Sequence, residues 1–276
     1  MNFHNIIITG SKGFIGHTLI QGLSHHNIVS IENSKQSLNL PNIIDLNKQY
    51  NMICCGAYIL KSNTSIYDPI KSITDNILNS FISLYNIRYN ISHICLLSTI
   101  DIYGQTNVIP INEENLTQPV TYYAISKLCL ENYLKLFCQE FNIPLCILRL
   151  GHIYGKNDNS GKVIYKLIDN AKNNSNIILY NKGQDVRNYV YINDATNIIQ
   201  YSSLNKINGI YNLVSNQNIS IKQLAKMIIK LTNSQSKIIY ENKNNKPIKL
   251  IFNNQKLQQI YNFTFTPIEH GIYELL

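Results

Sequence analysis

The first sixteen residues place three glycines directly behind an apolar, β-branched run. Residues 5–9 form that run, and Gly10, Gly13 and Gly16 follow it at intervals of three, leading into a helical pattern of apolar residues. A strand, a tight glycine turn and a helix N-terminus together bind pyrophosphate, because the backbone approaches the phosphates closely and the helix dipole favours anions. We therefore predict a dinucleotide-binding βα unit at the start of the chain.

The end of the next apolar run bears on the choice of cofactor. Residues 27–31 form that run and Glu32 follows it, where a carboxylate accepts hydrogen bonds from the adenosine ribose hydroxyls. Lys12 and Lys35 are alternative partners for the 2′-phosphate of NADP. The cofactor is therefore NAD or NADP, and Glu32 favours NAD. The candidate contacts in this part of the chain are Gly10, Lys12, Gly13, Phe14, Ile15, Gly16 and Glu32.

Apolar runs alternate with helical periodicity through the first half of the chain. We expect strands at 5–9, 27–31, 37–40, 51–55, 93–98 and 144–149, with helices between most of them. This alternation is typical of an α/β fold with a Rossmann-type, doubly wound parallel sheet. The pattern loosens after residue 155 and returns to the sheet at 189–214. We expect a dinucleotide-binding domain made of 1–155 and 187–214, and a small, discontinuous C-terminal substrate lobe made of 156–186 and 215–276.

A tyrosine, a lysine and two hydroxyl residues carry the candidate chemistry. Tyr123 and Lys127 lie four residues apart and project from the same face of a helix. A lysine cation there stabilises the phenolate and lowers the pKa of the tyrosine toward the working range. Ser98 and Thr99 end the apolar strand 93–98, at the edge where a parallel sheet binds its ligands. We expect Thr99, Tyr123 and Lys127 to act together on a carbonyl or alkoxide.

Composition excludes several other classes. The chain has 276 residues, 45% of them hydrophobic and only 14% charged, with a formal net charge of +8. The lysines are spread along the chain and no nucleic-acid-binding motif accompanies them, although the charge suits an anionic nucleotide substrate. The six cysteines have no metal-ligand spacing and are typical of buried thiols in a reducing compartment. No apolar run is long enough to span a membrane, and the first strand leaves no room for a signal peptide, so we expect a cytoplasmic protein without metal.

Seven segments of the chain together resemble the extended short-chain dehydrogenase/reductases, the nucleotide-sugar epimerase/dehydratase group. The glycine loop matches the cofactor fingerprint of that family, residues 98–104 (STIDIYG) resemble its strand end, and Tyr123 with Lys127 falls on its catalytic pair. Residues 149–155 (RLGHIYG), 184–194 (QDVRNYVYIND), 209–213 and 220–225 follow its later motifs. The resemblance covers nearly the whole chain and implies a Rossmann fold with a nicotinamide cofactor and a nucleotide-diphosphate sugar as substrate.

The resemblance also implies roles for individual residues. Gly56, Ala57 and Asn76 are expected near the cofactor, together with Tyr123 and Lys127. Ser98, His152 and Arg187 are expected at the substrate, with Arg187 on the diphosphate, although His152 replaces the asparagine usual in this family. Lys243, Lys246 and Lys249 fall where relatives carry a diphosphate-binding arginine, and the sequence does not choose among them.

Two expected helices carry broad apolar faces. The helix around 70–89 presents Ile70, Ile73, Ile77, Phe81 and Leu84, and the helix around 122–141 presents Ile125, Leu128, Leu136 and Phe137. In the family the equivalent helices pair across a two-fold axis, which implies a homodimer through a four-helix bundle. Ordinary core packing is the alternative explanation of both faces.

The residues directly after Thr99 narrow the choice among the reactions of this family. Related 4,6-dehydratases carry an Asp-Glu pair directly after the catalytic threonine, whereas Ile100 and Asp101 stand here. We therefore expect an NAD(P)-dependent oxidoreductase that reduces a nucleotide-linked 4-keto-(6-deoxy) sugar. The alternative is an NDP-sugar 4-epimerase with tightly bound NAD. A redox sensor or scaffold of this fold is disfavoured, because Thr99, Tyr123 and Lys127 are all retained.

Overall fold

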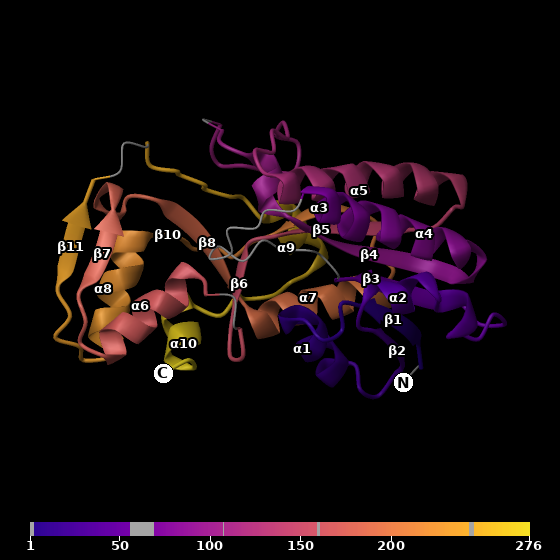
Figure 1. Ribbon diagram of the computed structural model, residues 1–276, viewed down its shortest axis with the longest axis horizontal. Coiled ribbons are helices and arrows are strands. Elements are labelled where there is room, and N and C mark those ends of the chain that lie inside the picture. The colour runs from indigo at the N-terminus through magenta and orange to yellow at the C-terminus, as the bar shows by residue number, and fades with distance from the viewer. Residues whose placement is uncertain (1–2, 56–68, 107, 159–160, 243–245) are drawn as a thin grey trace. The chain divides into compact units, whose positions relative to one another are not determined.

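The computed structural model describes residues 3–55, 69–106, 108–158, 161–242 and 246–276 (Figure 1). Contacts divide the chain into two compact units. The first unit comprises Met1–Gly104, Leu116–Leu150 and Ile192–Leu213, and the second comprises Gln105–Asn115, Gly151–Tyr191 and Val214–Leu276. The boundaries drawn from sequence differ in four places, since residues 105–115, 151–155, 187–191 and 214 cluster with the second unit. Residues 151–155 and 187–191 belong to the second unit because strand β6 (His152–Tyr154) pairs with strand β8 (Val186–Tyr191).

The first unit is built on a six-stranded parallel sheet, as the sequence predicts. Its strand order is β2-β1-β3-β4-β5-β9. The strands span Asn27–Ile31 (β2), Asn5–Thr9 (β1), Tyr50–Cys54 (β3), Ile91–Thr99 (β4), Leu145–Leu150 (β5) and Gly209–Leu213 (β9). Every neighbouring pair is parallel. All the carboxyl ends therefore lie at one edge, where such folds bind ligands.

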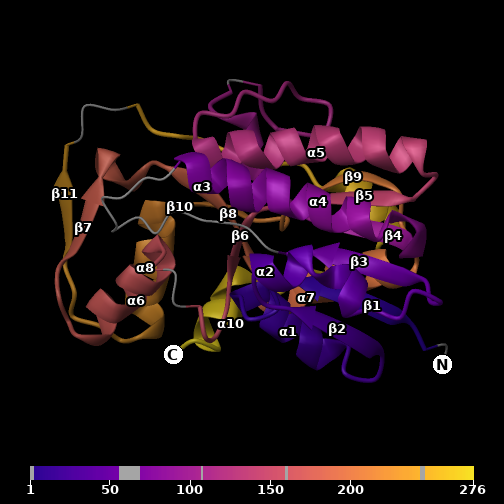
Figure 2. The same ribbon diagram turned by 45° about the vertical axis from the view of Figure 1, so that its right-hand side comes forward.

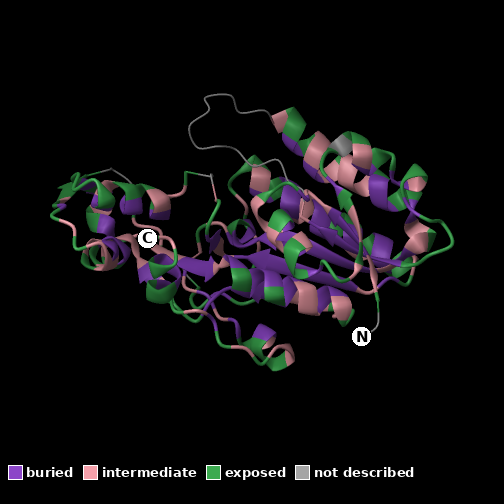
Figure 3. Cartoon of the chain, turned by 90° about the horizontal axis from the view of Figure 1, so that it is seen from below, coloured by how far each residue is buried: buried purple, intermediate pink, exposed green. Residues whose placement is uncertain are grey.

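Helices cover both faces of this sheet (Figures 1 and 2). α1 (Phe14–Gly22) and α7 (Ile192–Leu204) contact each other on one face. On the other face lie α2 (Ser34–Leu38), α3 (Pro69–Ile73), the π-helical turn η2 (Thr74–Leu78), α4 (Asn79–Asn86) and α5 (Tyr122–Glu140). Short 3₁₀ turns occur at Leu40–Asn42 (η1), Arg88–Asn90 (η3) and Ile100–Tyr103 (η4). Coverage on both faces explains why the inner strands β3, β4 and β5 are almost wholly buried and why most of the sheet is drawn as buried in Figure 3, whereas the edge strand β2 is partly exposed.

The strand expected at 37–40 is wrong. This segment forms the end of α2 and the start of η1 instead. Asn33 caps α2 by accepting a hydrogen bond from the Gln36 amide, and Leu40 is buried while Leu38 is exposed. A local side-chain cap therefore determines the conformation of a segment whose alternating pattern also suits a strand.

The second unit has two small sheets and its own core. One sheet has the order β10-β8-β6, with β10 at Asn218–Ser220, and the other pairs β11 (Ile238–Glu241) with β7 (Ile177–Tyr180). Its helices are α6 (Val163–Lys172), α8 (Ile221–Leu231), α9 (Gln255–Ile260) and α10 (Ile268–Tyr273), with a 3₁₀ turn η5 at Asn181–Gly183. Apolar residues of α6, α8, α10 and β7 form one buried cluster. This core organises the unit separately from the parallel sheet.

Candidate active site

The glycine loop adopts the geometry that a dinucleotide site needs. Gly10 follows β1 with φ of 64°, a region that glycine enters without steric cost, and its carbonyl accepts a 2.9 Å hydrogen bond from the Gly13 amide. A Cβ at Gly16 would overlap the Gly10 carbonyl oxygen, so only glycine fits there. Gly13 is the N-cap of α1 and offers no side chain to the helix N-terminus, where Phe14 and Ile15 form the first turn. The loop fits a pyrophosphate group.

Lys12 and Glu32, the two candidate cofactor residues of opposite charge, form an ion pair. The Lys12 Nζ atom lies 2.6 Å from Glu32 Oε2, with the lysine side chain largely exposed. The Gln36 side chain accepts a 2.8 Å hydrogen bond from the Glu32 amide, and the Ser11 amide donates to the Ile31 carbonyl at 3.1 Å. The glycine loop is thereby tied to the end of β2, with a carboxylate and an ammonium side by side.

Thr99, Tyr123 and Lys127 come together at the end of β4. Thr121 caps α5 by accepting a 3.2 Å hydrogen bond from the Ala124 amide, so Tyr123 lies in the first helical turn. The hydroxyl groups of Tyr123 and Thr99 are hydrogen-bonded. The buried Lys127 ammonium donates a 2.8 Å hydrogen bond to the Leu97 carbonyl, two residues before Thr99. The phenol, the hydroxyl and the ammonium therefore share one site at the carboxyl edge of the sheet.

The electrostatics of this site differ from the sequence expectation in one respect. Burial raises the pKa of Tyr123 above its ordinary value, the Asp101 carboxylate raises it further, and the hydrogen bond with Thr99 opposes both. Burial also lowers the pKa of Lys127 to about 8, against the opposing effect of Cys54, Cys55 and Glu131. The lowering of the tyrosine pKa that the sequence predicted from Lys127 is therefore not found: burial and Asp101 raise this pKa, and Thr99 is the group that acts to lower it.

Thr99 and Ser98 point to opposite sides of the strand, as successive strand residues do. Thr99 accepts a 3.2 Å hydrogen bond from the Asp101 amide, which starts η4, and Asp101 is the exposed residue of that turn. Ser98 is buried and donates a 2.5 Å hydrogen bond to Glu131 on α5. We expected Ser98 at the substrate, but this bond directs its hydroxyl into the protein.

Asn76 lies in the π-helical turn and reaches the helix that bears Tyr123. Its amide donates to the Ser126 hydroxyl at 2.9 Å and to Ser72 at 3.4 Å. Ser126 in turn donates to the Tyr123 carbonyl at 2.8 Å. Asn76 is therefore part of a buried polar cluster behind Tyr123. The remaining cofactor candidates, Gly56 and Ala57, lie outside the described residues.

His152 and Arg187, the other substrate candidates, belong to the second unit. His152 lies on β6, and its ring meets that of Tyr189 edge-on, with centroids 5.7 Å apart. Burial lowers the pKa of His152 to about 3, and Arg187 and Lys162 act in the same direction. The imidazole is therefore neutral and offers one donor and one acceptor, as an asparagine amide does. Arg187 lies on β8 and donates to the Val186 carbonyl at 3.1 Å.

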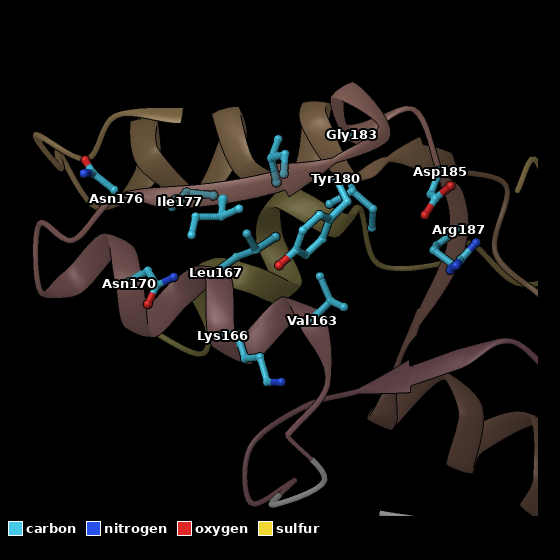
Figure 4. A pocket seen from close by; sticks show the side chains of 13 residues that line it. Val163, Lys166, Leu167, Asn170, Asn176, Ile177, Tyr180, Gly183, Asp185 and Arg187 are labelled. Atoms are coloured by element: carbon cyan, nitrogen blue, oxygen red, sulfur yellow. The ribbon is translucent and has the colours of Figure 1, made fainter. Parts of the chain in front are cut away.

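A cavity of about 350 Å³ lies in the second unit between α6, β7 and the start of β8 (Figure 4). The Tyr180 ring lines it, with Leu167 and Val163 on the helical side, and Asp185 and Arg187 stand together at one end. Lys249 pairs with Val186 in an isolated bridge, which brings the segment around residue 249 beside the same strand. The sequence predicted Arg187 as a diphosphate contact, but it did not predict a site role for Asp185, which lies in the same motif, or for Tyr180, which lies shortly before it.

The described residues contain no cluster of His, Cys, Asp and Glu that suits a metal ion. In the same part of the chain, every helix is too short or too polar to cross a bilayer. All six cysteines are unpaired.

Comparisons with known proteins agree with this fold. The chain is 26% identical over 260 residues to a putative UDP-glucose 4-epimerase of Methanocaldococcus jannaschii, covering 86% of this chain and 85% of the relative. It is 23% identical over 266 residues to human dTDP-D-glucose 4,6-dehydratase, covering 84% and 76%. The structure of RMD from Pseudomonas aeruginosa complexed with NADPH superposes with a TM-score of 0.86 at 18% identity, covering 99% and 97%.

The sequence pattern of one family spans nearly all of the first unit, including the strand-end and tyrosine motifs, and also covers the arginine motif of the second unit. It is described as the NAD dependent epimerase/dehydratase family, and it matches residues 6–213. That range includes the glycine loop, the site at the end of β4 and Arg187. The chain is therefore a member of the NAD-dependent epimerase/dehydratase family.

Proposed function

We propose that this protein is an NAD(P)-dependent oxidoreductase that acts at C4 of a nucleotide-diphosphate sugar and reduces a 4-keto-(6-deoxy) sugar. The observation that carries this proposal is the convergence of Thr99, Tyr123 and Lys127 at the end of β4. A phenol hydrogen-bonded to a hydroxyl, with an ammonium one turn away, suits proton transfer to a ketone oxygen.

Each of the three side chains has a separate task in this proposal. The bound nicotinamide supplies the hydride that reduces C4. Tyr123 donates its proton to the ketone oxygen as that oxygen becomes an alkoxide, and Thr99 holds the oxygen by a hydrogen bond. We assign to the Lys127 ammonium, one helical turn away, the stabilisation of the phenolate that remains. A proton from solvent then restores the phenol.

The residues after Thr99 support reduction over elimination of water. Ile100 is buried at 1% exposure and carries no acid, so Asp101 is the one carboxylate of η4. Elimination needs one group to remove a proton and a second to protonate the leaving hydroxyl, whereas reduction needs only the tyrosine site. A 4-epimerase also needs no further acid and remains the second candidate, favoured by the similarity to a putative UDP-glucose 4-epimerase.

The cavity of the second unit supports a nucleotide as the anchor of the substrate. Tyr180 offers a ring face for a base, and Arg187 offers several donors for a diphosphate. Of the three candidate lysines, we assign the diphosphate contact to Lys249, because it pairs with the strand that carries Arg187. Lys246 lies three residues before Lys249, outside this bridge, and Lys243 lies outside the described residues.

The Lys12–Glu32 ion pair supports use of either cofactor. Glu32 suits the ribose hydroxyls of NAD, and Lys12 suits the 2′-phosphate of NADP once it leaves the carboxylate. We favour NAD weakly, as the acid lies at the strand end. For cell location we propose the cytoplasm, because four of the six thiols are buried and all are unpaired.

We further propose a homodimer that forms through α3, α4 and α5. Their outer faces carry exposed apolar side chains, among them Ile70, Ile73, Ile125 and Leu136. Leu84 and Phe137 point into the core instead, so each helix has a second apolar face beyond the one that its own sheet covers. A two-fold partner buries these faces without further change.

The function is tested by cofactor consumption with a panel of nucleotide-linked 4-keto sugars that differ in base. We expect stoichiometric oxidation of NADH or NADPH with one of them, and Tyr123→Phe lowers kcat at least ~100-fold. The matched control is Tyr122→Phe, which alters an exposed neighbour on the same helix.

Other results separate the alternatives. Purified protein that retains NAD and interconverts C4 epimers without net consumption identifies the epimerase. Full turnover by Tyr123→Phe contradicts the assignment of the proton donor. Dinucleotide binding without turnover of any sugar on the panel favours a sensor or scaffold.

A further inference from the structure

A row of polar side chains crosses the sheet beneath the candidate site. Ser98 of β4 lies opposite Arg149 of β5, which lies opposite Asn212 of β9. All three are buried, at exposures of 3% or less. Polar groups so deep in a parallel sheet destabilise the fold unless each of them is hydrogen-bonded.

Glu131 of α5 binds this row from the helix side. Arg149 approaches its carboxylate with two nitrogens, Nη2 at 2.9 Å and Nε at 3.3 Å, and Ser98 donates to it at 2.5 Å. Arg149 also donates at 2.8 Å to the Tyr103 hydroxyl, which donates at 2.8 Å to Asn212. Glu131 is fully buried. One ionic network therefore joins β4, β5, β9, η4 and α5.

The network touches each element that carries a candidate catalytic group. Ser98 precedes Thr99, Tyr103 ends the turn that Thr99 caps, and Glu131 lies on the same helix as Tyr123 and Lys127. Residues four apart on a helix share a face, so Glu131 is one turn below Lys127 and two below Tyr123. The positions of the phenol and of the Thr99 hydroxyl therefore depend on the same buried bonds.

The groups that act on the Lys127 ammonium come from three elements. The Cys54 and Cys55 thiols lie at the end of β3, the Leu97 carbonyl belongs to β4, and the Glu131 carboxylate belongs to α5. Both thiols have a raised pKa caused first by burial, so they stay neutral. Glu131 is the one carboxylate among these groups. It supplies a negative charge one helical turn from the buried cation, and its effect is the smallest of the three that raise the pKa of Lys127.

We propose that Glu131 is a positioning residue for Tyr123 and Lys127. Arg149 and Ser98 hold its carboxylate, and these bonds fix the position of α5 relative to β4. The same carboxylate places one negative charge a helical turn from the Lys127 ammonium. The role of the pair in reduction rests on the proposed function, but the placement itself does not. A buried ion pair of this kind adds little net stability compared with apolar side chains of equal volume, so its value lies in geometry and charge.

The experiment compares Glu131→Gln with Tyr103→Phe. Both variants remove hydrogen bonds from the network, but only the first removes the charge beside Lys127. The titration of Lys127 is followed by NMR of protein labelled with ¹³C at the lysine ε-carbon, and the resonance is assigned by its absence from Lys127→Met. This measurement needs neither substrate nor cofactor.

We expect the Lys127 midpoint to fall by about one pH unit in Glu131→Gln and to stay unchanged in Tyr103→Phe. Glu131→Asp restores most of the midpoint, because the charge returns. In the active enzyme, Glu131→Gln lowers kcat about tenfold or more, leaves KM nearly constant and moves the alkaline limb of the rate profile by the same shift.

An unchanged midpoint in Glu131→Gln overturns the proposal, whatever happens to stability. Where that single variant does not fold, Glu131→Gln with Arg149→Met leaves no unpaired buried charge and replaces it in the same titration. In the Glu131–Arg149 ion pair, Glu131 is the residue that acts on Lys127, so the titration midpoint of Lys127 again falls in the double variant. A shifted midpoint in a protein that reduces no 4-keto sugar keeps the placement and rejects the proposed function alone.

Discussion

At the scale of single residues, buried titratable groups show how this chain couples its fold to pH. His93 at the start of β4 is fully buried, and its Nε2 atom hydrogen-bonds the Ile207 carbonyl at 2.8 Å. Burial lowers the pKa of His93 to about 4, a direction that Lys206 reinforces and the bond to Ile207 opposes. The imidazole is therefore neutral in the folded protein at physiological pH.

We predict that His93 makes the protein unstable in mild acid. Between pH 6.5 and about 4 the unfolded chain binds a proton that the folded chain does not, so the free energy of unfolding falls as pH falls. From pH 7.5 to pH 5 this residue removes about 2 kcal/mol. In urea titrations at both pH values, His93→Gln loses that share of the pH dependence. The exposed control His270→Gln keeps it, and an equal slope in both variants contradicts the prediction.

At the scale of elements, the turn between β7 and β8 builds the cavity of the second unit. β7 alternates buried and exposed residues, so Ile177 and Leu179 enter the core. Tyr180 is partly exposed and lines the cavity (Figure 4). Gly183 turns the chain with φ of 67°, in close approach to Leu179 and Lys222. The turn then carries the chain to Asp185 and Arg187 at the cavity mouth.

We predict that Tyr180→Ala weakens binding of the nucleotide part of the substrate. Stacking of a base on an aromatic ring is worth ~1–3 kcal/mol, so the affinity falls about fivefold to a hundredfold. Isothermal titration with free nucleoside diphosphates measures this loss, and kcat at saturating substrate changes less than KM. The control is Tyr240→Ala on the neighbouring strand β11, which does not line the cavity. If Tyr180→Ala and Tyr240→Ala bind nucleoside diphosphates with equal affinity, the base does not stack on Tyr180.

At the scale of the whole molecule, the outer helices of the first unit form the surface through which we propose that two copies associate. Apolar side chains that a monomer leaves in water are exposed along α3, η2, α4 and α5. Leu136 is 69% exposed at the C-terminal half of α5. Since α5 also carries Tyr123 and Lys127, a dimer contact on its outer face supports the helix that bears the site.

We predict that Leu136→Glu converts a dimer into a monomer. A buried carboxylate without a partner opposes association, and two copies meet at a two-fold interface, so the effect is doubled. Light scattering coupled to size exclusion measures the mass, which should halve. The control Gln21→Glu adds the same charge at an exposed position of α1, outside the three helices of the proposed interface, and keeps the wild-type mass. A wild-type protein that is already monomeric at micromolar concentration rejects the dimer.

Local signals in the sequence determined the fold class and the residue types of the candidate site. The apolar runs around the glycine loop, the Tyr123–Lys127 spacing and the hydroxyl pair at 98–99 each act within one turn or one strand. Such short-range patterns survive in any compact structure of the chain, and for this reason the parallel sheet was predictable. The strand expected at 37–40 failed because the cap at Asn33 competes with an equally local pattern.

Only the tertiary structure decided which of those side chains meet. Ser98 and Thr99 are neighbours in sequence, yet Ser98 binds Glu131 while Thr99 binds Tyr123. Glu131 itself lies among apolar residues of α5, and nothing local pairs it with Arg149, eighteen positions further along the chain. The burial of Lys127 and the raised pKa of Tyr123 likewise come from packing of α5 against β4. Desolvation depends on the atoms that surround a group in space, and the sequence alone does not assign those neighbours.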